Sequence, residues 1–132
     1  MEKNSKKELV MSHCRMISDM VMTENAYLNL PLNAQALYVQ LMLNADDEGF
    51  VENTKRVLKM VGVSKKVLKP LLDKGYIIYF EQSDVSVISH WYRHNRMYKY
   101  RPTSCFQEKK ALCLVDNCYI LSTEVVENLS GN

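Results

Sequence analysis

Glycine and proline, the residues that make chains flexible or extended, are scarce in this sequence: 132 residues contain 4 glycines and 3 prolines. Internal repeats and low-complexity segments are also lacking, so a flexible linker between two domains is not expected. No apolar run approaches the roughly 18 residues that a membrane-spanning helix needs, and residues 1–13 lack the apolar core of a signal peptide. These absences predict one compact domain in the cytoplasm, with no membrane partner.

Paired cysteine motifs are missing as well. The four cysteines, at positions 14, 105, 113 and 118, form no CxxC pair, and without an export signal we expect reduced thiols rather than disulfides. His90 and His94 precede three of them, but the spacings match no common zinc site. No nucleophile stands beside a recognisable base. We therefore predict no metal, no cofactor, no catalytic residues and no enzymatic activity.

Charge is present in quantity but unevenly spread. Residues 1–52 carry 4 basic and 8 acidic side chains (net −4), residues 53–110 carry 13 and 4 (net +9), and residues 111–132 carry 0 and 3 (net −3). A positive middle segment between acidic flanks is typical of a surface that binds a polyanion, although solvated charge clusters are also common.

A long helix is predicted to begin at Asn33. Ala34, Leu37, Tyr38 and Leu41 recur at helical spacing, and apolar residues also lie on the opposite side, so we expect a helix buried nearly all round. A short helical turn is expected before it, over residues 23–28.

Three consecutive acids, Asp46, Asp47 and Glu48, follow the long helix. Negative charge is disfavoured at a helix C-terminus, so we expect these side chains in solvent while Gly49 turns the chain. A catalytic pair of carboxylates would need a pocket and an acid–base partner, and nothing near them in sequence supplies either.

Two shorter helices are predicted next. Asn53 caps residues 54–61, which end at Gly62, and Ser64 caps residues 65–74, which end at Gly75. Two short helices joined by a tight turn are typical of a helix-turn-helix. Pro70 interrupts the second helix, so a kink or a local 3₁₀ turn is expected over residues 66–69.

Two hairpins complete the prediction. The first pairs YIIYFE with VSVISHW across residues 82–84. The second pairs ALCLV with CYIL across Asp116 and Asn117, a good two-residue turn, and is expected to extend the sheet. Helix, short strand, two helices and hairpin, in that order, predict an α+β fold: a winged helix-turn-helix with a three-helix core, a β-hairpin wing and an extra C-terminal hairpin.

The run HWYRHNRMYKYRPT, residues 90–103, interleaves aromatic and basic side chains. Guanidinium groups pair with phosphates, and aromatic rings stack on unpaired bases at about 1 to 3 kcal/mol per base. The alternative is that the aromatic residues close the core while the basic ones stay solvated, and for Trp91 we favour the core.

The stretches AYLNLPLNAQALYVQLMLNADDEGFV, LLDKGYII and HWYRHN resemble the N-terminal winged-helix domain of phage replisome organisers and related DnaD-like replication-initiation proteins of Gram-positive bacteria and their mobile elements. The resemblance runs from Arg15 to Thr103, with Pro70 as a departure in the third helix. It implies a domain that binds origin DNA or self-associates in a bacterial cytoplasm. In that family a separate C-terminal domain engages DNA and the helicase-loading machinery.

We thus predict a polar leader (1–14), a winged-helix domain (15–103) and a C-terminal hairpin extension with a tail (104–132). The expected function is a DNA-binding module of a phage or mobile-element replication initiator, with duplex or single-stranded DNA as partner. The alternative is a protein-interaction module that self-associates or inhibits a host nucleoprotein. The predicted DNA-binding residues are Lys55, Arg56, Lys59, Lys65, Lys66, Lys69, Arg93, Arg96, Tyr98, Lys99, Tyr100 and Arg101.

Overall fold

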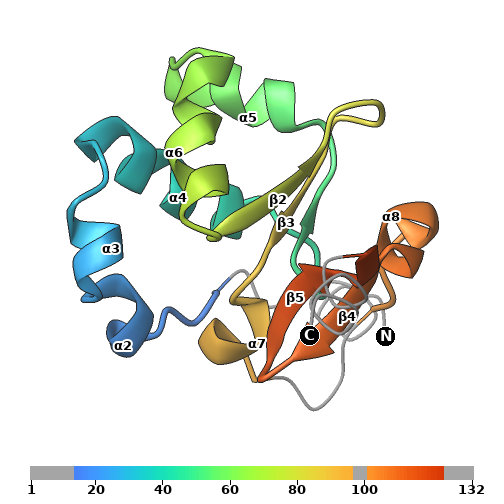
Figure 1. The fold of residues 1–132 in the computed structure, drawn as a ribbon. Helices are drawn as coiled ribbons and strands as arrows, with labels where there is room; N and C mark the ends of the chain where they lie inside the picture. The colour runs from blue at the N-terminus through green and yellow to red at the C-terminus, as the bar shows by residue number, and fades with distance from the viewer. Residues whose placement is uncertain (1–13, 97–100, 124–132) are drawn as a thin grey trace, which may run out of the picture.

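The described elements alternate between short helices and antiparallel strands, which gives a mixed α+β architecture (Figure 1). The structure is a computed structural model that describes residues 14–96 and 101–123. In chain order the elements are α2 (Asp19–Met22), α3 (Asn25–Leu28), α4 (Leu32–Leu43), β1 (Phe50–Val51), α5 (Thr54–Val61), the 3₁₀ helix η1 (Lys65–Val67), α6 (Leu68–Asp73), β2 (Ile77–Phe80), β3 (Val85–Ile88), α7 (Trp91–His94), α8 (Phe106–Lys110), β4 (Leu112–Val115) and β5 (Cys118–Leu121). None of the helices in these ranges is long and apolar enough to cross a membrane.

Helix α4 supplies the centre of the core on one face only. Leu37, Tyr38 and Leu41 are fully buried, as their helical spacing predicts. The opposite side is partly open: Ala36 is exposed and Leu43 is 50% exposed, whereas Val39 is half-buried against the core. The prediction of a helix buried nearly all round was therefore wrong, because no element within the described part of the chain covers Ala36 and Leu43.

Helices α5 and α6 follow their sequence signals closely. Helix α5 has the predicted bounds and ends at Gly62, whose φ of +84° is the left-handed conformation that glycine adopts without strain. The third predicted helix divides into η1 and α6. Because α6 begins at Leu68, Pro70 falls in its first turn, where a missing N–H costs no helical hydrogen bond. Pro70 is thus accommodated by a 3₁₀ turn just before it, close to where one was expected.

The main sheet has the strand order β1-β3-β2, and both pairs are antiparallel. Val87 in the central strand pairs with Phe50 on one side and with Ile78 on the other. The β2–β3 hairpin forms as predicted, but β3 ends at Ile88. Trp91, expected to continue the strand, begins α7 and is fully buried in the core.

The C-terminal hairpin forms across the predicted turn, with φ of +51° at Asp116 and +63° at Asn117. Strands β4 and β5 make a separate two-stranded sheet, so the expectation that they extend the first sheet was wrong. Tyr119 of β5 is buried: its ring meets Phe50 edge-on at 5.5 Å, and its backbone N–H donates to the carbonyl of Ser89 at 2.8 Å. The hairpin therefore shares the core of the rest of the fold.

Candidate nucleic-acid interface

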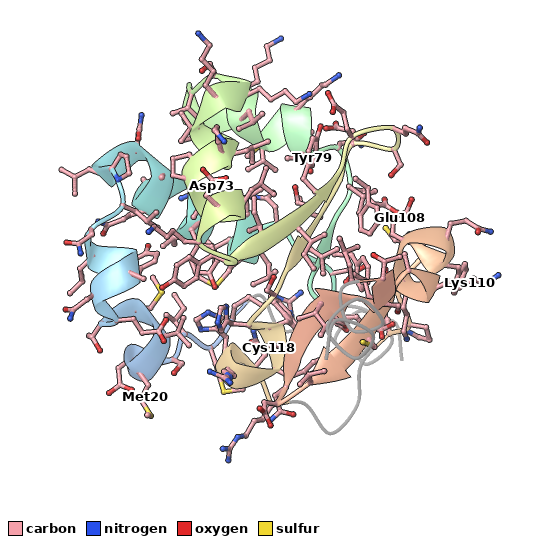
Figure 2. The ribbon with its side chains drawn as sticks, viewed as in Figure 1. Met20, Asp73, Tyr79, Glu108, Lys110 and Cys118 are labelled. Atoms are coloured by element: carbon pink, nitrogen blue, oxygen red, sulfur yellow. The ribbon has the colours of Figure 1, made fainter. Side chains whose placement is uncertain are left out.

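Helices α5 and α6, with η1 between them, carry a group of exposed basic side chains at one end of the molecule. Side chains tipped with nitrogen atoms project outward there (Figure 2). Apolar residues Val57, Leu58, Leu68 and Leu71 are buried beneath them, so the amphipathic pattern of the helices turns the basic residues to solvent. We call this group the basic helix surface; its members are Lys55, Arg56, Lys59, Lys65, Lys66 and Lys69.

Two lysines of the basic helix surface form ion pairs. Lys65 Nζ lies 2.7 Å from Glu81 Oε1 of the hairpin turn, and Lys69 Nζ lies 3.3 Å from Asp73 Oδ2 one helical turn later. All four side chains are well exposed, so water screens both pairs and either lysine can exchange its partner at little cost. Lys59 and Lys66 form no ion pair with any residue that the structure describes.

The β2–β3 hairpin is fixed to the start of α5 by Asp84. Its carbonyl oxygen accepts from the N–H of Thr54 at 3.0 Å, and its carboxylate accepts from the N–H of Lys55 at 3.1 Å and from the hydroxyl of Tyr79 at 2.7 Å. Asn53, the expected capping residue, makes no side-chain cap hydrogen bond. The capping group therefore comes from the hairpin, about 30 residues later in sequence.

The remaining predicted residues do not join the basic helix surface. Helix α7, which carries Arg93, lies at the opposite end of the molecule from α5 (Figure 1). Arg93 is exposed, its Nε donates to the carbonyl oxygen of Asp116 at 3.2 Å, and Arg96 is exposed just beyond α7. Arg101 is also exposed and lies beside the acidic residues after α4. Tyr98, Lys99 and Tyr100 lie outside the described residues.

Those acidic residues, Asp46, Asp47 and Glu48, form what we call the acidic corner, and their predicted exposure to solvent was wrong. Glu48 is 2% exposed and Asp47 is 7% exposed. Glu48 accepts from the N–H of Thr103 at 2.6 Å and from Lys109 Nζ at 2.6 Å. Their burial follows from donors far along the chain, which the sequence pattern around the helix end did not reveal.

The rest of the acidic corner is equally well bonded. Asp46 accepts from the backbone N–H groups of Glu48 and Phe50 and from the hydroxyl of Thr103. Burial raises the pKa of Asp46, and these three hydrogen bonds oppose the rise. Asp47 accepts from Arg15 at 3.2 Å and from the N–H of Arg101 at 3.0 Å. The acidic corner thus connects the end of α4 with the segment after residue 100.

Both ring nitrogens of His94 also make hydrogen bonds within the protein. Its Nδ1 accepts from the backbone N–H of Ser18 at 2.9 Å, which places the ring proton on Nε2, 2.8 Å from the hydroxyl oxygen of Tyr38. Burial, together with the neighbouring His90, lowers the pKa of His94 to about 4. The ring is therefore neutral near pH 7 and joins the N-terminal segment to α4.

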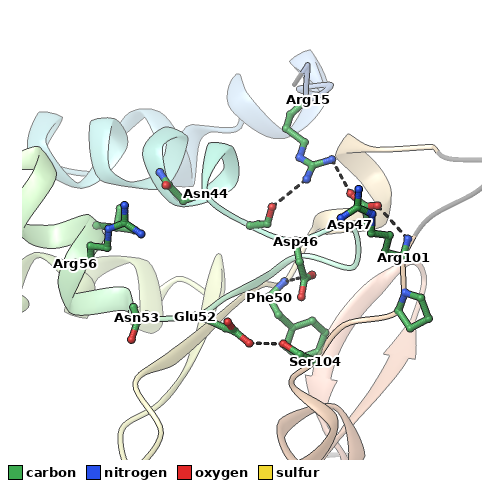
Figure 3. Close-up of a pocket in the computed structure, with 13 residues that line it drawn as sticks. Arg15, Asn44, Asp46, Asp47, Phe50, Glu52, Asn53, Arg56, Arg101 and Ser104 are labelled. Atoms are coloured by element: carbon green, nitrogen blue, oxygen red, sulfur yellow. Dashed lines mark hydrogen bonds and ion pairs between the residues drawn. The ribbon is translucent and has the colours of Figure 1, made fainter. Parts of the chain in front are cut away.

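A cavity of about 510 Å³ lies between the end of α4, the start of α5 and residues 101–104 (Figure 3). Arg56 and Arg101, separated by 45 positions in sequence, both line it. Arg15 lines it too, and its guanidinium is held by Asp47, by the carbonyl oxygen of Ala45 at 3.0 Å and by the ring of Trp91, whose centre lies 5.3 Å away. We call this space the arginine cavity.

Comparisons of the chain with models of protein families, with curated proteins and with solved structures found no match.

Proposed function

We propose that this chain is a winged-helix DNA-binding module of a phage or mobile-element replication initiator, and that it acts by binding rather than by catalysis. The order of its elements supports the proposal: α4, β1, α5, η1 with α6, and the β2–β3 hairpin follow the helix, strand, helix, helix and wing of that fold. The hairpin would be the wing and α6 the recognition helix. The role in replication rests on the family resemblance of the sequence.

The observation that carries the proposal is the basic helix surface. Its six basic side chains are all exposed, on α5, η1 and α6, and the buried apolar face beneath them fixes their direction. Lysine and arginine at such positions would contact DNA phosphates, which sets affinity and register, while the exposed side of η1 and α6 would reach the base edges. Because α6 begins at Leu68, Pro70 lies in its first turn and does not interrupt the helix that would dock on DNA.

The test is fluorescence anisotropy of labelled duplex and single-stranded DNA over a range of salt concentrations. If six phosphates are contacted, log K should fall against log salt with a slope of about −5. Lys66→Gln should weaken duplex binding and reduce the steepness of that slope by about one.

Lys110→Gln is the matched control, because it removes the same charge from α8, away from α5 and α6 (Figure 2). It should leave both affinity and slope close to the wild-type values. Equal effects of the two substitutions would mean that net charge, and not the basic helix surface, governs binding. An affinity independent of salt would contradict the mechanism altogether.

One observation favours the alternative function, a module that binds itself or a host nucleoprotein. Near the N-terminal end of the described chain, Met20 is 80% exposed, Leu28 is 54% exposed and Leu32 is 82% exposed. Exposed apolar residues of this size occur at protein contact sites. Light scattering over a range of protein concentrations tests self-association: a mass that rises in the wild type but not in Leu32→Ser would support it.

A further inference from the structure

Strand β4 has an unpaired edge on the outer side of the C-terminal hairpin. Its partner β5 faces the rest of the fold, because the N–H of Tyr119 in β5 donates to the carbonyl oxygen of Ser89 (Figure 1). Among the described strands, β4 pairs with β5 alone. The end of β4 is also open to solvent, with Leu114 52% exposed and Val115 46% exposed. One side of β4 is therefore open to pairing with a further strand.

The register of the hairpin decides which backbone groups of β4 point to that outer edge. In an antiparallel pair, opposite residues alternate between exchanging both hydrogen bonds and exchanging none. The N–H of Ser122 donates to the carbonyl oxygen of Ala111, and the two-residue turn requires the same alternation, so Cys113 also bonds to β5. The N–H and C=O groups of Leu112 and Leu114 then point away from β5, and no described residue bonds to them.

The composition of β4 does not protect this edge. Natural proteins commonly blunt an edge strand with charged residues, proline or a bulge, which prevent pairing with another chain. Residues 112–115 read LCLV, with no charge and no proline, and their pairing with β5 contains no bulge. A regular, apolar edge with unpaired backbone groups is suited to accept a strand from another molecule.

We propose that β4 pairs with β4 of a second copy of this chain, antiparallel about a two-fold axis at Cys113. In this register Leu112 of each copy lies opposite Leu114 of the other, and each pair exchanges two hydrogen bonds. All the outward-facing groups of Leu112 and Leu114 are then satisfied, which no other antiparallel register achieves. The contact is self-complementary, as a two-fold axis requires, and it joins two hairpins into one four-stranded sheet.

The charges that flank β4 favour the same pairing. Lys110 precedes the strand and Asp116 follows it; both are exposed, and neither forms an ion pair with any described residue. Antiparallel pairing about Cys113 brings Lys110 of one copy towards Asp116 of the other at both ends of the joined strands. Opposite charges across neighbouring strands stabilise a sheet, whereas a parallel pairing would set like charges side by side.

This contact lies beyond the proposed DNA-binding function and does not depend on it, because β4 belongs to neither α5 nor α6. It is also distinct from the exposed apolar residues near the N-terminal end of the described chain, such as Leu32. Substitutions in β4 can therefore be compared with substitutions in those other surfaces.

Oxidative cross-linking tests the register directly. The two Cys113 residues would face each other as a pair without mutual hydrogen bonds, with Cα atoms about 4.5 Å apart. A disulfide spans Cα separations of about 4.4 to 6.8 Å. Diamide, whose N=N bond takes up the two thiol hydrogens, should therefore convert the wild type into a disulfide-linked dimer.

Cys113→Ser should abolish this covalent dimer. Cys14→Ser is the matched control, because it removes an exposed cysteine outside the β4–β5 sheet, and it should leave the cross-linked product in place. A cross-linked dimer that survives Cys113→Ser, or the absence of one in the oxidised wild type, would overturn the proposal.

Leu114→Pro tests the hydrogen bonds without disulfide chemistry. Proline removes an N–H that points to the outer edge, so the bonds between β4 and β5 remain and the hairpin should fold. The dimer should weaken about tenfold or more in sedimentation equilibrium, since two of its four hydrogen bonds are lost. Leu114→Ala is the matched control: it shortens the same side chain but keeps the N–H, so the dimer should persist.

Urea unfolding followed by the fluorescence of Trp91 checks that each variant is folded. Lys110→Glu should weaken the dimer by setting an acid beside Asp116 of the second copy, whereas Lys59→Glu on α5 should not. Leu32→Ser should leave both the dimer and its cross-link intact. A dimer that withstands Leu114→Pro, or one that only Leu32→Ser removes, would overturn the proposal.

Discussion

Replacing Gly49 by alanine should destabilise the fold strongly, because Trp91 occupies the space that a side chain would need. A Cβ atom on Gly49 would lie 2.6 Å from Cγ of Trp91 and 2.8 Å from its Cβ, and the residue has a φ of +92°. Trp91 cannot easily move aside. It is fully buried, and its Nε1–H donates to the carbonyl oxygen of Asp47 at 2.9 Å.

The expected cost has two main parts. An L-residue at positive φ costs about 1 to 2 kcal/mol, and forcing extra atoms into a packed core costs about 1 to 3 kcal/mol. Displacing Trp91 would add the loss of its hydrogen bond, about 1 kcal/mol. Gly49→Ala should therefore lose about 3 to 6 kcal/mol, a large part of the roughly 5 to 15 kcal/mol that stabilises a domain.

Gly75→Ala is the matched control, because Gly75 also has positive φ, +77°, but nothing lies within 4 Å of a Cβ built there. It should lose only the backbone part, about 1 to 2 kcal/mol. Urea unfolding followed by fluorescence measures both variants, and Trp91, the single tryptophan of the chain, reports on the affected site itself. Equal losses in the two variants would refute the argument that contact with Trp91 dominates.

Two other predictions concern buried polar groups. The folded pKa of His94 is about 4 against an ordinary 6.5, so the unfolded chain binds more protons between these values. The free energy of unfolding should then fall by up to about 3.5 kcal/mol as pH drops from above 6.5 to below 4, at about 1.4 kcal/mol per pKa unit. Urea unfolding across this range should show a shallower pH dependence in His94→Gln; an unchanged dependence would exclude His94 as its source. Glu48→Gln should lower the free energy of unfolding by about 1.5 to 3 kcal/mol, because the buried side chain loses its negative charge opposite Lys109. Glu81→Gln is the control, since it breaks the exposed pair with Lys65. It should cost far less, because water screens that pair. The same unfolding assay compares them, and similar losses would contradict the role assigned to burial.

Local signals in the sequence predicted several elements well. The bounds of α5, its end at Gly62, the 3₁₀ turn before Pro70 and both hairpin turns depend on the backbone preferences of a few adjacent residues. Apolar spacing likewise identified the buried face of α4. These features could be predicted because their causes lie within one or two turns of the chain.

The contacts of the acidic corner could not be predicted in this way. The helix dipole favours solvent exposure for three consecutive acids after a helix, yet Glu48 is buried because Thr103 and Lys109 supply its donors. The N-terminal cap of α5 also comes from a distant residue: Asp84 of the hairpin accepts the hydrogen bond that the adjacent Asn53 was expected to accept. In both places a partner distant in sequence outweighs the local preference.

Some features of the candidate sites were likewise set by local sequence, and others by contacts between distant segments. The sequence by itself determined the mixed α+β class and the lysine-rich, amphipathic pattern of α5 and α6, because periodicity and charge are properties of short segments. Only the tertiary structure decided that Arg93 lies away from that surface, and that Arg56 and Arg101, 45 positions apart in sequence, line the same cavity. The physical reason is that backbone propensity acts between neighbours in sequence, whereas the position of a charged side chain depends on which distant segments pack together.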